Sequence, residues 1–383
     1  MTHYAHITGW GMAVPERVMT NEEISRLVDT DDAWIQSRTG IRERRVAGVK
    51  ETTTSLAIQA AQRALEVADI APEDIELIIV ATCTPEYHFP ATACLVQDAI
   101  GAAKAGAFDL SAACTGFIYA VGMASQSIKI GAVKSALVIG AETMSRVVDW
   151  KDRGTSILFG DGAGAIVLQG SETPGGVLSF MMRSDGSGGD LLSLAGPGFI
   201  RPSGDEGLLE HRIQMNGREV FRFASRVMVS ATKEVAAAAG LQMDQINLII
   251  PHQANRRIIE SAARGLNLPE ERFMVNVDRY GNTSTASIPI ALCEAVEADR
   301  VRPNDHMVLV GFGGGLTWGA LAVQWDVIRP PVVSRWHQVE RRARYTWARV
   351  RSWIRRLLRR LEGLLFGSQA PEAGEPPKRG EKK

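Results

Sequence analysis

The stretch GAFDLSAACTGFIYAVGMAS, residues 106–125, decides how the rest of the chain is interpreted. An apolar segment ends at Leu110, small residues lead to Cys114, and a helical pattern starts at once. A cysteine at the N-terminus of a helix lies near the positive end of the peptide dipoles, which favours a thiolate. The small residues leave room for a substrate, so we interpret Cys114 as a nucleophile and not as a buried, inert thiol.

Short apolar runs alternate with alanine-rich stretches on both sides of this segment. The runs have the continuous apolar character of strands in a sheet that is covered on both faces, and they are Ile75–Thr82, Ala136–Ala141, Gly164–Leu168 and Met307–Gly311. The alanine-rich stretches predict helices over Thr53–Asp69, Ala91–Ile100 and Gly116–Ile130. This alternation is typical of the α/β class.

The chain also repeats itself. The segment EDIELIIVATCTP, from Glu73, resembles MDQINLIIPHQAN, from Met243. Glycine-rich strand segments follow in the same order, with GDGAGAIVLQG from Gly160 and GGLTWGALAVQW from Gly314. The repetition predicts a body of two similar halves, residues 3–172 and 173–328, and not a solenoid, which needs more and shorter repeats.

Two further polar residues stand at ends of predicted strands or turns. His252 follows the apolar run that ends at Pro251, and the carboxyl ends of buried strands are where α/β proteins build their sites. Asn282 lies in a Tyr-Gly-Asn turn before a helix start rich in serine, threonine and alanine. Taken alone, His252 fits a buried structural histidine and Asn282 fits a turn or N-cap residue.

A glycine cluster, GFGGG at residues 311–315, follows the last predicted apolar strand. Glycines at such a turn could bring a backbone N–H close to a developing oxyanion, although a plain tight turn has the same composition. The cluster is not a phosphate-binding loop of the Walker type, because no Lys-Ser/Thr pair follows it.

Together these segments resemble the β-ketoacyl-[acyl carrier protein] synthase III family over nearly all of residues 1–328. The opening block GMAVPERVMTNEEISRLVDTDDAWIQSRTGIRERR is similar to that family's N-terminus. The segments DLSAACTGF, DRGTSILFGDGAGAIVL, MNGREVF, PHQAN, YGNTSTASIP and GFGGGLTWG recur in the family's order. The resemblance implies a thiolase-like fold with two pseudo-symmetric halves and central mixed sheets, layered αβαβα.

The resemblance also implies an activity and a catalytic set of Cys114, His252 and Asn282. The cysteine takes an acyl group from acyl-CoA; malonyl-acyl carrier protein then loses CO₂, and its enolate attacks the acyl-enzyme. This decarboxylative Claisen condensation initiates fatty acid synthesis. His252 and Asn282 would stabilise the enolate oxygen, and the N–H groups of Cys114 and Gly315 would form the oxyanion hole for the tetrahedral intermediate.

The remaining implied contacts concern substrates and partners. Coenzyme A would bind through Trp34, Arg38, Arg153, Gly217, Phe221 and Asn255, with the adenine between Trp34 and Arg153 and the phosphates near Arg38. Arg222 and Arg257 would meet the acidic carrier protein, and Phe89 would close the acyl pocket of the partner in a homodimer. The resemblance implies no metal and no cofactor beyond the two thioester substrates, and we expect no nucleic-acid partner.

Other activities of the Cys–His–Asn type remain open. Hydroxymethylglutaryl-CoA, chalcone and quinolone-type synthases use the same three residue types, whereas thiolases use a second cysteine and elongating synthases a second histidine. A papain-like hydrolase is excluded, because AACTG is not its cysteine signature and Cys114 is far from the N-terminus. A different class is a membrane-tethered scaffold without catalysis, against which the intact Cys–His–Asn set argues.

Composition places the enzyme in a reducing compartment. Of 383 residues, 45% are hydrophobic and 22% are charged, and the 4 cysteines form no CxxC pair. No basic-then-apolar leader opens the sequence and no uncharged apolar run reaches spanning length, so we expect a cytoplasmic protein. The net charge of zero is uneven, since residues 331–383 carry 14 basic and 5 acidic residues and residues 1–330 are left at −9.

This basic C-terminal segment lies beyond the family body. An apolar stripe with alternating spacings of four and three predicts an amphipathic helix over residues 334–366, at Ala343, Trp347, Val350, Ile354, Leu357, Leu361 and Leu364. The helix could pack on the acidic body, or form a coiled coil, which would place arginines beside arginines along its seam. Tryptophans and an arginine-rich polar face favour a peripheral anchor on an anionic membrane surface. Residues 367–383 have a disordered composition.

Overall fold

The first of two mixed sheets contains the N-terminal predicted strands. The structure is a computed structural model that describes residues 3–196, 211–326 and 335–366. The sheet has the order β1-β7-β6-β4-β5, built from β1 (Tyr4–Ala13), β4 (Leu77–Ala81), β5 (Gly106–Leu110), β6 (Ser135–Thr143) and β7 (Asp161–Ser171). β4 pairs in parallel with β5 and β6, whereas β7 runs antiparallel to β6 and β1.

The second sheet repeats this arrangement over four strands. Its order is β11-β12-β13-β8, built from β8 (Gly176–Ser184), β11 (Ile246–Pro251), β12 (Asp305–Gly313) and β13 (Thr317–Trp325). β11 and β12 are parallel, and β13 is antiparallel to both β12 and β8, so the directions match those of β4, β6, β7 and β1. The predicted α/β class with two similar halves is therefore confirmed, while the border at residues 172/173 remains our proposal.

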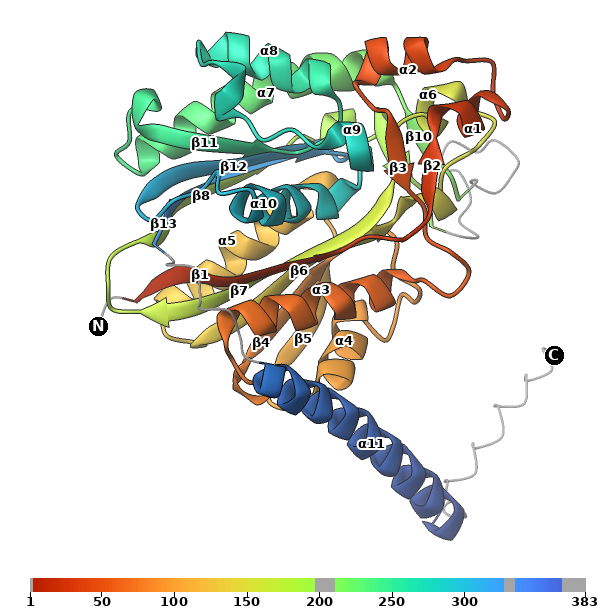
Figure 1. Cartoon of the computed structure of the whole chain (residues 1–383), viewed down its shortest axis with the longest axis vertical. Helices are drawn as coiled ribbons and strands as arrows, with labels where there is room; N and C mark the ends of the chain where they lie inside the picture. The colour runs from red at the N-terminus through yellow and green to blue at the C-terminus, as the bar shows by residue number, and fades with distance from the viewer. Residues whose placement is uncertain (1–2, 197–210, 327–334, 367–383) are drawn as a thin grey trace, which may run out of the picture. The chain divides into compact units, whose positions relative to one another are not determined.

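Helices occupy the layers between and outside the sheets, as Figure 1 shows. The inner layer holds α5 (Gly116–Lys129) and α10 (Ser287–Glu297), each of which contacts strands of both sheets. α3 (Thr53–Ala68) and α4 (Thr92–Ile100) cover the first sheet, and α7 (Gly217–Ala238) and α8 (Arg256–Leu266) cover the second. These layers give the predicted αβαβα order, and the predicted helices α3, α4 and α5 are confirmed to within about a residue.

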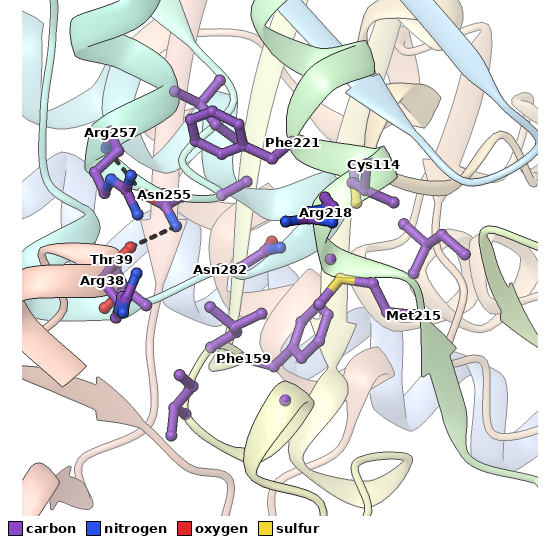
Figure 2. Close-up of a pocket in the computed structure, with 18 of the residues that line it drawn as sticks. Arg38, Thr39, Cys114, Phe159, Met215, Arg218, Phe221, Asn255, Arg257 and Asn282 are labelled. Atoms are coloured by element: carbon purple, nitrogen blue, oxygen red, sulfur yellow. Dashed lines mark hydrogen bonds between the residues drawn. The ribbon is translucent and has the colours of Figure 1, made fainter. Parts of the chain in front are cut away.

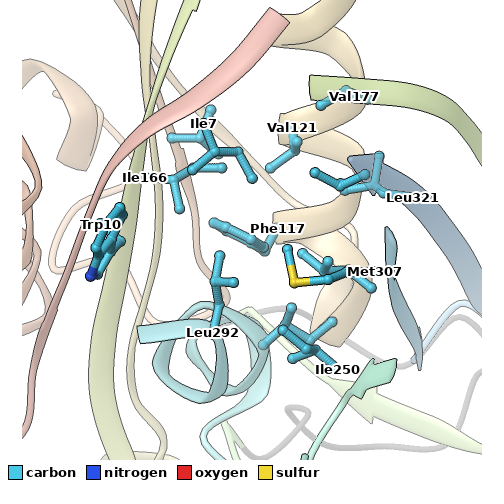
Figure 3. Close-up of a cluster of buried hydrophobic side chains, with 14 of the residues drawn as sticks. Ile7, Trp10, Phe117, Val121, Ile166, Val177, Ile250, Leu292, Met307 and Leu321 are labelled. Atoms are coloured by element: carbon cyan, nitrogen blue, oxygen red, sulfur yellow. The ribbon is translucent and has the colours of Figure 1, made fainter. Parts of the chain in front are cut away.

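The largest core cluster fills the space around the two inner helices. Phe117 and Val121 of α5 and Leu292 of α10 meet Ile7 and Ile166 from the first sheet, as Figure 3 shows. Side chains of the second sheet close the cluster from the other side, namely Ile250, Met307 and Leu321. Because α5 begins beside Cys114 and is buried over most of its length, this packing fixes the position of the cysteine.

Shorter elements complete the body. They are β2 (Val18–Thr20), α1 (Asn21–Ser25), α2 (Asp32–Thr39), β3 (Glu43–Arg45), α6 (Arg153–Ser156), β9 (Leu192–Leu194), β10 (Ile213–Met215) and α9 (Val277–Tyr280). Single 3₁₀ turns stand before the two inner helices, η2 (Ala113–Thr115) before α5 and η7 (Ser284–Ala286) before α10. These turns carry or border the predicted catalytic residues.

The C-terminal basic segment forms a second compact unit, which begins at Ser334. Its described residues form one helix, α11 (Arg335–Phe366), where the sequence predicts a helix over 334–366. The predicted disordered tail, residues 367–383, lies outside the described residues. No helix in the described part of the chain is both long and apolar enough to cross a membrane.

Candidate active site

One cavity of about 710 Å³ gathers most of the predicted site residues. It is lined by the three predicted catalytic residues, Cys114, His252 and Asn282. The same walls hold seven of the residues assigned to coenzyme A or the carrier protein, which are Trp34, Arg38, Gly217, Phe221, Arg222, Asn255 and Arg257. In Figure 2, Cys114 lies to the right, Arg38 and Arg257 lie to the left, and Asn282 lies between them.

Cys114 sits in a tight turn between β5 and α5. Ala113, which precedes it, has a φ of 46°, a left-handed conformation that costs a non-glycine residue about 1 kcal/mol. Thr115 holds the turn, because its hydroxyl donates to the carbonyl of Ala112 at 2.6 Å. β12 can approach the Cys114 turn closely only because residue 313 is glycine. A Cβ at this position would lie 2.6 Å from the backbone nitrogen of Cys114.

The protonation state of Cys114 differs from the sequence-based prediction. Burial raises the pKa of the Cys114 thiol to about 12, and the nearby carboxylate of Glu142 acts in the same direction. A hydrogen bond with Ser284 lowers the pKa, but burial outweighs it. The prediction of a resting thiolate at the helix N-terminus is therefore wrong, because the turn that aims the side chain also removes it from water. The resting residue is a thiol.

His252 presents one unsatisfied ring nitrogen to the cavity. It follows β11 and is 1% exposed, and its backbone N–H donates to Val310 at 2.8 Å. Nδ1 is paired with the Ser287 hydroxyl at 2.6 Å, whereas Nε2 is buried and has no hydrogen-bond partner among the described residues. Burial lowers the pKa of His252 to about 3, so the ring is neutral at physiological pH.

The depressed pKa of His252 predicts a stability effect in mild acid. The unfolded chain, with a histidine pKa near 6.5, binds a proton that the folded chain excludes until about pH 3. The free energy of unfolding should therefore fall as pH drops through this window, and this histidine alone should cost about 2 kcal/mol between pH 7 and 5. Urea unfolding of wild type and His252→Gln at both pH values measures it. An equal loss in both proteins would show that His252 does not titrate as described.

Asn282 is held by its backbone and by its side-chain oxygen. Its backbone N–H donates to Leu158 at 2.8 Å, and its carbonyl accepts from Gly160 at 3.0 Å. Oδ1 accepts the backbone N–H of Ser284 at 2.8 Å, which leaves the amide Nδ2 as the free donor of the side chain. Gly281 makes the turn possible, because its φ of 63° and a Cβ position 2.6 Å from the Leu158 carbonyl both exclude a side chain.

Glu142 is a residue that the sequence-based prediction missed. It lies at the end of β6 and is fully buried, and burial raises its pKa. Its carboxylate accepts the backbone N–H of Cys83 at 3.1 Å and hydroxyl protons from Thr82, Thr84, Ser284 and Thr285. It thereby fastens the loop after β4 to the turn η7 next to Asn282. The only signal was an acid in the otherwise apolar stretch ALVIGAET.

The predicted adenine clamp is closed in this structure. The Arg153 guanidinium lies 5.0 Å from the centre of the Trp34 ring, and that of Arg38 lies 5.8 Å from it. A ring inserted between two stacked groups needs about 7 Å, twice a normal contact distance, so adenine would have to displace one of them. Asp31 orients Trp34 by capping α2 at 2.7 Å. Arg153 does not itself line the cavity, although its neighbour Gly154 does.

Phe89 and Gly315 are not brought to the cavity. Phe89 is 87% exposed, in a loop outside the cavity wall. Gly315 also stands outside the lining, and a Cβ there would meet Thr317. Gly313, two residues earlier, is the glycine that approaches the Cys114 backbone. The roles assigned to Phe89 and Gly315 therefore remain predictions from the resemblance.

The mouth of the cavity is basic. Arg222 of α7 pairs with Glu219 at 3.0 Å, and Arg257 of α8 lies 5.4 Å from the Phe221 ring centre. Arg218, one turn before Arg222 on α7, also lines the cavity and was missed by the sequence-based prediction. Within the described residues, no cluster of histidine, cysteine and acidic side chains could hold a metal ion.

Comparisons with known proteins agree with these observations. The family model described as 3-oxoacyl-[acyl-carrier-protein] synthase III matches residues 108–186. The model of the C-terminal part of the same family matches residues 236–325. A β-ketoacyl-[acyl-carrier-protein] synthase III from Roseiflexus sp. strain RS-1 is 51% identical over 85% of this chain and 99% of its own length.

Solved structures give the same result. The Thermus thermophilus β-ketoacyl-[acyl carrier protein] synthase III superposes with a TM-score of 0.80 at 49% identity, over 84% of this chain and 99% of its own. The priming β-ketosynthase of the R1128 polyketide pathway has a TM-score of 0.81 at 35% identity, over 86% of this chain and 98% of its own.

Proposed function

The chain belongs to the 3-oxoacyl-[acyl-carrier-protein] synthase III family, and on that premise we propose that Cys114, His252 and Asn282 carry out its initiating condensation. The enzyme joins an acyl-CoA primer to malonyl-acyl carrier protein at the start of fatty acid synthesis. Synthase III relatives are about 50% identical to this chain, whereas the priming β-ketosynthase of the R1128 polyketide pathway is 35% identical. This difference favours fatty acid initiation over polyketide priming. The observation that carries our proposal is that one cavity brings together the Cys114 thiol, the Asn282 amide and Nε2 of His252, which has no hydrogen-bond partner among the described residues.

In the first half-reaction, the sulfur of Cys114 attacks the thioester carbon of acyl-CoA. The C–S bond to coenzyme A breaks, and the thiol proton passes in net terms to the departing coenzyme A sulfur. The backbone N–H of Cys114, in the turn η2 before α5, is placed to donate to the tetrahedral oxyanion. Because burial keeps Cys114 protonated at rest, the thiol is protected from unwanted reactions until a thioester excludes water.

In the second half-reaction, malonyl-acyl carrier protein loses CO₂ and its enolate attacks the acyl-enzyme. The Ser287 hydroxyl is paired with Nδ1 of His252 at 2.6 Å and accepts the backbone N–H of Gln253 at 3.4 Å, and we assign the hydroxyl proton to Nδ1. Nε2 of His252 then carries the single N–H proton of the neutral ring and, with Nδ2 of Asn282, would donate to the enolate oxygen. The Cys114 thiolate leaves, and its high pKa favours reprotonation.

Trp34 is proposed to bind the adenine of coenzyme A, which predicts a substrate-selective defect. Trp34→Ala should raise KM for acyl-CoA about 10-fold, the value of one aromatic stack, and leave kcat nearly unchanged. Steady-state assays with the matching acyl-pantetheine provide the control, because that substrate lacks the nucleotide. A KM increase of the same size for both substrates would contradict the adenine assignment.

Arg222 and Arg257 are proposed to dock the carrier protein. The double charge reversal Arg222→Glu/Arg257→Glu should lower kcat/KM for malonyl-acyl carrier protein by about 10- to 100-fold, mainly through slower association. The wild-type value should fall with rising salt, since exposed charges are screened. Arg264→Glu, on the same helix as Arg257 but outside the cavity lining, is the matched control. An equal loss in the control would remove the specific docking assignment.

The homodimer and the cellular location also belong to this proposal. Phe89 is a large exposed aromatic on a loop, which suits insertion into a partner subunit's acyl pocket. Sedimentation equilibrium should give the mass of two chains, and a monomer mass at assay concentration would contradict it. We place the enzyme in the cytoplasm, with peripheral attachment to membranes through residues 334–366.

A further inference from the structure

Helix α11 has no counterpart in the matched family region, whose profile ends at residue 325. The helix spans 32 residues and contains ten arginines, no lysine and two glutamates. Between Tyr345 and Leu361 there are six arginines and no acid. The condensation reaction does not need a helix with this excess of arginine. We therefore look for a separate binding partner of α11.

Large apolar side chains lie exposed along one side of α11. Their exposed fractions range from 39% at Ile354 to 63% at Trp347, and the others are Val350, Trp353, Leu357, Leu358 and Leu361. At 100° per residue, these seven positions fall within an arc of about 140°. The helix therefore carries a continuous apolar stripe over about four turns.

The opposite side of the helix carries the arginines together with Tyr345, Ala348 and Ser352, which are each 6% exposed. The six arginines of residues 345–361 fall within the opposite arc of about 180° and reach both borders of the stripe. Arg360 lies beside Trp353 at one border, and Arg351 lies beside Leu358 and Trp347 at the other. Tryptophan and arginine at such borders suit the headgroup boundary, where the ring stays half-immersed and the guanidinium reaches the phosphates.

We propose that α11 binds in the plane of an anionic lipid bilayer, with the apolar stripe toward the acyl chains and the arginines on the lipid phosphates. The stripe is wider than the seam of a two-stranded coiled coil, since Trp353 and Leu358 lie beside the seam positions and not in them. A homomeric coil would also set arginines against arginines beside its seam, which is unfavourable. Residues 1–330 carry −9, so electrostatic attraction to the bilayer must come from the C-terminal segment.

Vesicle co-sedimentation of the full-length protein tests this inference. The probes are vesicles of pure phosphatidylcholine and vesicles in which phosphatidylglycerol replaces one third of it. Wild type should pellet with the anionic vesicles at about 0.1 M salt and be released near 1 M salt, where the Debye length falls to about 3 Å. It should stay in the supernatant with the neutral vesicles and without vesicles.

Three variants separate the two contributions. Leu357→Glu/Leu361→Glu should weaken partitioning roughly 100-fold, because two partly exposed leucines no longer enter the acyl region. Arg355→Gln/Arg359→Gln should weaken it about 30-fold through the lost charges. Arg355→Lys/Arg359→Lys is the matched control and should bind as wild type does. Condensation activity without vesicles should be unchanged in all three, since none of these residues is in the active site.

Several outcomes would overturn the proposal. One is wild type that remains in the supernatant with anionic vesicles at low salt, which would leave packing on the acidic body as the account of α11. Another is binding that is unaffected by the leucine variant, which would indicate a purely electrostatic contact. Pelleting or a larger mass without vesicles that the leucine variant abolishes would indicate self-association. Because activity is measured separately, none of these results bears on the proposed condensation.

Discussion

Replacing Cys114 by alanine is expected to reduce condensation by roughly 10⁴-fold or more, the scale found when a covalent nucleophile is deleted. The variant cannot form the acyl-enzyme, so transfer from acyl-CoA should disappear. Cys114→Ser should be nearly as inactive, since a hydroxyl attacks a thioester far less readily than sulfur does. Release of coenzyme A from labelled acyl-CoA measures this step directly.

The same variant should keep part of the second half-reaction. His252 and Asn282 are anchored by Ser287 and Ser284, and neither contact involves Cys114. Cys114→Ala should therefore still release CO₂ from malonyl-acyl carrier protein. Cys94→Ala removes an exposed thiol outside the cavity and is the matched control, with full activity expected. Condensation at the wild-type rate in Cys114→Ala would contradict the assignment of Cys114 as the nucleophile.

Loss of either His252 or Asn282 should instead slow decarboxylation and largely spare acylation of Cys114. His252→Ala and Asn282→Ala should each slow decarboxylation about 100-fold or more, the usual effect of removing one preorganised oxyanion contact. Asn282→Asp is the sharper variant, because it replaces the donating amide nitrogen with oxygen at nearly constant size. Acylation of Cys114 should be affected much less in all three, since we propose that these donors act on the enolate and that the Cys114 backbone N–H acts on the first oxyanion.

Separate measurements of CO₂ release and coenzyme A release decide this point. The neutral state of His252 adds a pH criterion: with a pKa of about 3, the decarboxylation rate should show no histidine ionisation between about pH 5 and 8. Our assignment of roles is wrong if both variants fail chiefly at acylation. It is also wrong if decarboxylation follows an ionisation near pH 6.5 that His252→Ala removes.

Local patterns were sufficient to predict much of the fold and to single out Cys114, whereas the catalytic roles of His252 and Asn282 came from the resemblance to a family. Continuous apolar runs such as Ile75–Thr82 are unambiguous when a strand is buried on both faces, and the structure has β4 there. The cavity collects Cys114, which follows β5, His252, which follows β11, and Asn282, which follows the short helix α9. Their spacing along the chain does not require this meeting, so the resemblance to a family was needed to predict it.

Features that depend on three-dimensional packing were not predictable from local patterns. The helix N-terminus predicted a thiolate at Cys114, but complete burial reverses the direction of the pKa shift. Glu142 accepts hydrogen bonds from two distant segments, residues 82–84 and residues 284–285, which no local pattern reveals. The close approach of Gly313 to Cys114 depends on how β12 packs against η2, and three adjacent glycines look alike in sequence.

Trapping the acyl-enzyme tests the central claim most directly. Full-length protein is incubated with a series of acyl-CoA primers without malonyl-acyl carrier protein, and its intact mass and peptide masses are measured. We predict one acyl group per chain for an accepted primer, bound as a hydroxylamine-labile thioester on the peptide that contains Cys114, and discharged when malonyl-acyl carrier protein is added. An acyl group on any other residue, or condensation at the normal rate without a detectable acyl-enzyme, would contradict the account.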